Sequence, residues 1–251
     1  MLGKIIGHNR WSWAAFGKHP SAQDYFQINL LHPLVQAFAQ WVEDGFGRIP
    51  ETVRRNGVCS WRFWSRGLKK GTLLCGLGKS SGDGIGRPYP LMLLGEGRLD
   101  RWEKHWNLLP FVLAEAWDKM EYTAARRIEH ISQLEADLQR IQSPTPGWQD
   151  IRHSISQNLG DRSLLPIHKI IMAEIQNKAK TLETEQKLII LLNNHCHEDA
   201  LQMAGAWYHA LKSHFSGSPS TVFMGGSLDK TFLVFFNRPL MADDFIDLWS
   251  V

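Results

Sequence analysis

The sequence has few cysteines, no long hydrophobic run and almost no excess of charge. Its three cysteines, Cys59, Cys75 and Cys196, are odd in number and form no CxxC motif, which indicates a reduced chain without a disulfide framework. The longest apolar runs, at 188–192 and 232–236, are far shorter than the roughly 20 residues of a membrane-spanning helix. The first ten residues contain no apolar stretch typical of a secretion signal. We therefore expect a cytoplasmic protein with no membrane insertion.

The charge balance argues against a nucleic-acid partner. With 28 Lys and Arg against 25 Asp and Glu, the net charge is +3, and the basic residues are scattered, so we expect no nucleic-acid partner. An apolar share of 43% is ordinary for a globular protein. Tryptophan is the abundant residue: there are eleven, several in close pairs such as Trp61 and Trp64. We interpret most of them as core residues, with an interface role as the alternative.

The spacing of apolar residues predicts strands first, then helices, then a terminal hairpin and helix. Strands are expected at 11–16, 60–65, 72–77, 89–94, 221–224 and 231–236, and helical stretches at 33–47, 102–117, 128–141, 164–181, 198–215 and 239–249. Residues 187–193 fit a strand or a buried helix equally well. This order is typical of an α/β protein of the α+β kind, here a three-layer α/β/α sandwich with a mixed, largely antiparallel sheet. We expect one domain over 1–251, made of N-terminal strands and a glycine-rich loop (1–99), a helical middle segment (100–215) and a C-terminal hairpin and helix (216–251).

One cluster resembles the start of a zinc site. His195, His197 and Asp199 form His-x-His-x-Asp after the apolar run at 188–192, as in metallo-β-lactamase-like hydrolases. Alternate histidines on an extended segment point the same way and can share one metal ion. In those hydrolases a second histidine follows the aspartate, whereas here that residue is Ala200. A zinc-dependent hydrolase is therefore the alternative function, and we expect no metal site.

A nucleotide site is a weaker alternative. Gly78-Lys79-Ser80 suggests a P-loop, but the Walker pattern requires glycine where this chain has Leu73. We interpret 76–88, which contains five glycines, as a loop between two strands. The chain also has no Gly-x-Ser-x-Gly motif and no evident acid–base pair. The sequence thus predicts neither catalytic residues nor a cofactor.

Three groups of segments, taken in order, resemble one known family. The first is the aromatic–Gly-Lys-x-Pro turn within 13–26, ahead of the helix that carries Trp41. The second is Trp61-Arg62-Phe63 followed by the loop at 81–91, and the third is the strand and Pro-containing turn at 233–245. These segments are similar to the motifs of the TagF/ImpM family, accessory proteins of bacterial type VI secretion systems. One departure is that the family's Gly-Asp-Phe is Gln23-Asp24-Tyr25 here, which predicts an altered partner contact.

The resemblance implies a non-catalytic cytoplasmic regulator that binds the FHA-domain scaffold of the secretion apparatus and represses its assembly post-translationally. The residues expected to bind the partner are Lys18, Asp24, Tyr25, Trp61, Asp83 and Arg87. Charge reversal at Lys18 is expected to weaken this binding without unfolding the protein, and the tryptophan-bearing stretch at 102–117 is the alternative surface. Independently of the family, the spacing of Asp83 and Arg87 in a glycine-rich turn predicts an ion pair that holds the loop in one shape.

Overall fold

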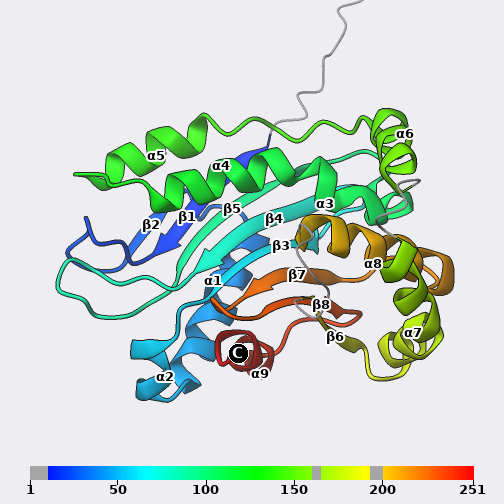
Figure 1. Ribbon diagram of the computed structural model, residues 1–251. Coiled ribbons are helices and arrows are strands. Elements are labelled where there is room, and N and C mark those ends of the chain that lie inside the picture. Colours follow the sequence, from blue (N-terminus) through cyan, green and yellow to red (C-terminus); the bar gives the residue numbers. More distant parts are fainter. Residues whose placement is uncertain (1–10, 160–164, 193–199) are drawn as a thin grey trace, which may run out of the picture.

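An eight-stranded sheet forms the centre of the computed structural model, which describes residues 11–159, 165–192 and 200–251. The strand order is β2-β1-β5-β4-β3-β7-β8-β6 (Figure 1). The strands are β1 (Ser12–Gly17), β2 (Phe26–Ile28), β3 (Ser60–Arg66), β4 (Thr72–Lys79), β5 (Leu91–Arg98), β6 (Lys187–Leu191), β7 (Thr221–Gly226) and β8 (Thr231–Phe236). Each pairing in the described sheet is antiparallel. The predicted α+β class is confirmed.

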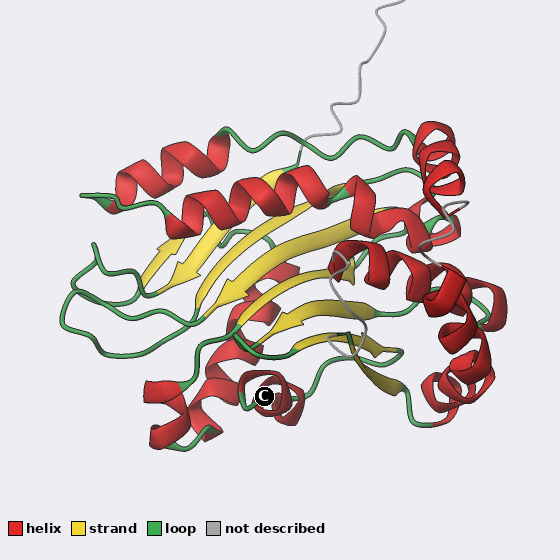
Figure 2. Ribbon diagram, in the orientation of Figure 1, coloured by secondary structure: helices red, strands yellow, loops and turns green. Residues whose placement is uncertain are grey.

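Helices cover both faces of the sheet (Figure 2). The α-helices are α1 (Pro33–Arg48), α2 (Glu51–Asn56), α3 (Leu109–Val112), α4 (Ala114–Ala125), α5 (Ile131–Gln139), α6 (Trp148–Leu159), α7 (Leu165–Thr184), α8 (Ala200–His214) and α9 (Ala242–Trp249). Two 3₁₀ turns, η1 (Trp102–Lys104) and η2 (Trp106–Leu108), precede α3. One core lies between the sheet and the layer of α3, α4, α5, α7 and α8, and a second lies under α1 and α9. None of these helices is long and apolar enough to cross a membrane.

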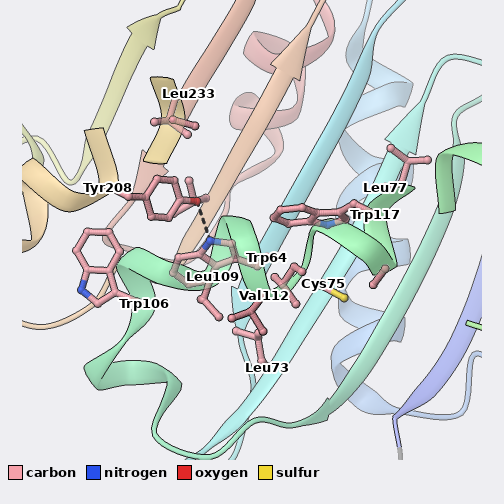
Figure 3. Packing of buried hydrophobic residues seen from close by; sticks show 14 of the residues in the cluster. Trp64, Leu73, Cys75, Leu77, Trp106, Leu109, Val112, Trp117, Tyr208 and Leu233 are labelled. Carbon is pink, nitrogen blue, oxygen red and sulfur yellow. Dashed lines mark hydrogen bonds between the residues drawn. The ribbon is translucent and has the colours of Figure 1, made fainter. Parts of the chain in front are cut away.

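The central strands bury side chains on both faces, and this explains their nearly continuous apolar sequences. In β4, Leu73 and Cys75 contact the larger core, while Leu74 contacts the smaller one. Figure 3 shows part of the larger core, where Trp64 of β3 and Tyr208 of α8 meet. Ten of the eleven tryptophans are buried, so their interpretation as core residues is confirmed.

The stretch at 102–117 differs from the expected single helix. It is broken into η1, η2, α3 and the start of α4. Pro110 lies in the first turn of α3 and has no backbone N–H to donate, so a helix that began upstream cannot run through it unbroken. Trp102, Trp106 and Trp117 are all buried, so these side chains cannot form the alternative partner surface predicted for this stretch.

The glycine-rich segment at 76–88 is only partly a loop. Strand β4 continues to Lys79, so Gly76 and Gly78 lie within the sheet and pair with Leu94 and Met92 of β5. A Cβ atom on Gly76 would collide with the ring of Phe63, so glycine serves close packing at this position. The loop therefore begins at residue 80.

Strand pairing and helix capping determine the secondary structure and the boundaries that sequence periodicity leaves open. Residues 187–191 form a strand because β8 offers them a complete antiparallel partner. The last helix begins at Ala242 and not at Pro239, since the Asp244 carboxylate accepts the backbone N–H of Met241 at 2.8 Å and caps the helix there. The short elements β2, α2 and α6 were not expected from the sequence.

Candidate functional site

Two turns that are far apart in the sequence lie side by side at one end of the sheet. Strand β1 ends at Gly17, which is paired with Leu91 at the start of β5. The turn that follows β1 (residues 18–25) therefore meets the loop that precedes β5 (residues 80–90), seen as the blue and teal turns in Figure 1. Gly17 has φ of 122°, and a Cβ atom there would collide with the carbonyl oxygen of Pro90, so this junction requires glycine.

The carboxylate of Asp83 holds the two turns together. Its Oδ2 accepts hydrogen bonds from Lys18 Nζ at 2.9 Å and from Arg87 Nε at 2.7 Å. Its Oδ1 accepts the backbone N–H groups of Arg87 at 2.9 Å and Ile85 at 3.2 Å. The predicted pair of Asp83 and Arg87 is confirmed. We call Lys18, Asp83 and Arg87 the hub.

The hub carboxylate is ionised although its side chain is fully buried. Burial by itself would raise the pKa of Asp83, but the hydrogen bonds from Lys18, Arg87 and Ile85 outweigh it and hold the pKa well below its usual range. Two cations against one anion leave the hub with a positive charge. Asp24 balances part of it, with Oδ2 at 3.2 Å from Arg87 Nη2 and Oδ1 at 3.8 Å from Lys18 Nζ.

Backbone contacts complete the link between the two turns. Gly84 N–H donates to the carbonyl oxygen of Ala22 at 2.9 Å, and Arg87 Nη2 donates to that of Gln23 at 3.1 Å. The two turns thus form one rigid unit, because side-chain and backbone bonds join them at several points.

Outside the hub, an aromatic and an aliphatic side chain face solvent. Tyr25 is 38% exposed and lies edge-on to Tyr89 at 5.4 Å, and Tyr89 in turn packs against Phe46. Ile85, at the tip of the loop, is 77% exposed. An aromatic ring, a loop-tip aliphatic residue and the half-exposed Arg87 are the kind of side chains that anchor protein contacts. The sequence analysis did not identify Ile85 or Tyr89, although an apolar residue inside a glycine-rich loop was a usable signal.

Two of the expected partner-binding residues are placed differently by the structure. Trp61 is 0% exposed and donates its indole N–H to the carbonyl oxygen of Leu248 at 3.0 Å, so it belongs to the core and not to a surface. Lys18 is largely buried with its ammonium group on Asp83. Charge reversal at Lys18 would therefore place two carboxylates together, so from the structure we expect it to destabilise the fold and not to leave folding intact. Asp24, Tyr25 and Arg87 remain at the surface.

The residues of the two alternative sites have different outcomes. His195, His197 and Asp199 lie outside the described residues. Within the ranges that the structure describes, no three His, Cys, Asp or Glu residues are grouped so that they could hold a metal ion. The proposed phosphate loop is not formed as such, because Gly76 and Gly78 are strand residues.

The fold and the hub define a class of protein: an antiparallel sheet between two helical layers, with two ion-paired turns at one end. The same fold is found in the crystal structure of PA0076 from Pseudomonas aeruginosa PAO1, with a TM-score of 0.51 over 95% of this chain and 94% of that chain. The two sequences are 14% identical, so this likeness concerns the fold. A comparison with curated proteins gave no match.

The family follows from the sequence match. The TagF N-terminal domain, described as type VI secretion system-associated, matches residues 14–143. The chain therefore belongs to the TagF family and has an accessory role in type VI secretion, and the resemblance noted from its motifs is confirmed. The matched segment contains the hub, Asp24 and Tyr25, together with nearly all of β1 to β5.

Proposed function

We propose that this protein acts in the cytoplasm as a non-catalytic, post-translational repressor of type VI secretion, and that it binds the FHA-domain scaffold of the apparatus. The observation that carries the proposal is the rigid pair of turns around Asp83, which presents Tyr25, Ile85 and Arg87 together. A preformed surface loses little conformational entropy when it binds a partner. The family match, which assigns the chain to type VI secretion, supports the choice of a partner within that apparatus.

Binding of the purified scaffold protein to the full chain tests the proposed surface. Ile85→Ser removes the exposed anchor without touching the hub, and we expect it to weaken binding at least tenfold, which is about 1.4 kcal/mol. Leu68→Ser is the matched control, because Leu68 is 70% exposed in the turn at the opposite end of β4. Wild-type protein that does not bind the scaffold would refute the partner. Equal binding by Ile85→Ser and wild type would refute the surface.

A secretion assay tests the sign of the regulation. Deletion of the gene should increase the release of secreted substrate, and expression of wild-type protein should reverse this more strongly than expression of Ile85→Ser. Unchanged or reduced release after deletion would contradict repression.

Metal analysis distinguishes the alternative hydrolase. About one zinc ion per chain, lost together in His195→Ala and His197→Ala, would favour zinc chemistry over the binding role. We expect less than a tenth of that amount, and no fall in melting temperature when a chelator is added.

A further inference from the structure

A groove of about 680 Å³ lies beside the hub, and the proposed scaffold contact does not use it. Its walls come from the turn after β1 (His19–Ser21), from the end of β4 and the following loop (residues 79–82), and from the end of α4 with the residues after it (124–128). Lys79, Arg126 and Arg127 bring three positive charges, and none of the described residues that line it is an aspartate or glutamate. All of these residues lie within the family match.

Most of this positive charge is not compensated. Arg126 is paired with Asp137 at 3.0 Å, but neither Lys79 nor Arg127 forms an ion pair with any residue that the structure describes. His19, buried in the wall, responds to this charge: burial lowers its pKa, and the charge of Lys79 lowers it further. His19 in its neutral form adds no charge, so the positive potential of the groove comes from the lysine and the arginines.

The other groups in the groove suit an anion. The hydroxyl group of Ser81 forms no hydrogen bond within the described ranges, so it remains free to donate. The C-terminal end of α4 makes the electrostatic potential in the groove less positive, since a helix carries about half a negative charge at that end. The two full positive charges of Lys79 and Arg127 exceed this partial charge, and the groove as a whole attracts anions.

We propose that this groove binds a phosphate-type dianion, carried either by a phosphorylated side chain or by a small phosphate ester. A phosphate monoester has nearly two negative charges and three acceptor oxygens, and here it meets an ammonium and a hydroxyl group from one wall and a guanidinium group from another. The volume exceeds what a bare phosphate fills, which leaves room for the group that carries it.

Titration calorimetry on the full chain, at constant ionic strength, tests the proposal with O-phosphoserine, glycerol 3-phosphate and serine as probes. We expect saturable binding of at least one phosphate and none of serine. Binding of O-phosphoserine alone points to a phosphorylated side chain, and binding of glycerol 3-phosphate alone points to a small ester. If neither phosphate binds, the proposal is wrong.

Three substitutions locate the binding. Lys79→Ala and Arg127→Ala should each weaken phosphate binding at least fivefold, with an unchanged melting temperature as the check on folding. Lys70→Ala is the matched control, since Lys70 is exposed in the turn at the opposite end of the same strand, roughly 23 Å of strand away. Unchanged binding by Lys79→Ala and Arg127→Ala, or an equal loss in Lys70→Ala, would overturn the assignment. Scaffold binding by the Ile85 variant is a separate readout, so the two proposals can fail independently.

Discussion

Removal of one hydroxyl group, in Tyr208→Phe, should destabilise the protein by an amount that follows from a single contact. The indole N–H of Trp64 in β3 donates to the Tyr208 hydroxyl of α8 at 2.8 Å, and both side chains are buried (Figure 3). Phenylalanine keeps the ring, which packs against Trp106 and Phe235, but leaves the indole N–H without an acceptor. An unsatisfied buried donor costs about 1–3 kcal/mol. For a chain of this size that lowers the melting temperature by about 2–12 °C.

Denaturant unfolding, followed by tryptophan fluorescence and far-ultraviolet circular dichroism, measures this cost. Tyr122→Phe is the control, because Tyr122 is 59% exposed and its hydroxyl group has no hydrogen-bond partner among the described residues, so the loss should stay under about 0.5 kcal/mol. A Tyr208→Phe variant as stable as this control would refute the reasoning.

The same experiment tests the prediction of one domain over 1–251. Trp64 lies inside the family match and Tyr208 outside it, and the sheet continues across that boundary from β3 to β7. If the chain is one cooperative unit, both probes should give one transition, and Tyr208→Phe should shift all of it. Two transitions, of which the variant shifts only one, would show separate domains.

Three further outcomes follow from the structure. Asp83→Asn should be less stable than wild type, by a margin that is constant between about pH 6 and 8 and shrinks below about pH 4. The reason is that a carboxylate with a lowered pKa stabilises the fold above its unfolded pKa and loses that effect as the pH falls. Thermal melts across this range measure the margin, and a margin independent of pH would contradict the prediction. Lys18→Glu should lower the melting temperature more than Lys18→Met, since it adds a second carboxylate beside Asp83, and equal melting temperatures would argue against the hub. Gly45→Ala should lower the free energy of unfolding by about 1–3 kcal/mol, because its Cβ would collide with Phe245 of α9. Gly47→Ala on the same helix should be neutral or stabilising, because no described atom lies within contact distance of its Cβ. Denaturant unfolding measures both variants, and similar losses of stability would refute the packing argument.

The sequence predicts those features of the structure that depend on residues close to each other in the chain. The pair of Asp83 and Arg87 could be predicted because four residues of a tight turn bring the two side chains within reach. The strand at 60–66 could be predicted from the alternation of Trp61 and Phe63 with polar residues, and the strand at 231–236 from its run of apolar, β-prone residues. Neither needs information about a distant part of the chain.

The remaining features depend on contacts between distant segments. Lys18 reaches Asp83 across 65 residues, and no sequence signal connects the two. The error at Trp61 has a related cause: a strand covered on both faces buries both of its alternating sets of side chains, so alternation does not reveal which set is free. The groove also could not be predicted, because Lys79 and Arg127 belong to segments that only the fold brings together.

The hub connects two surfaces of unlike chemistry. The turn after β1 supplies Lys18 to the hub and His19 to one wall of the groove, while the loop before β5 supplies Asp83 to the hub and residue 82 to a second wall. Loss of Asp83 would therefore disturb both surfaces at once, whereas Ile85→Ser reaches only the exposed tip and Lys79→Ala only the groove. Because ion pairs and backbone bonds fix both turns, a ligand in the groove meets walls that are tied directly to the proposed scaffold contact.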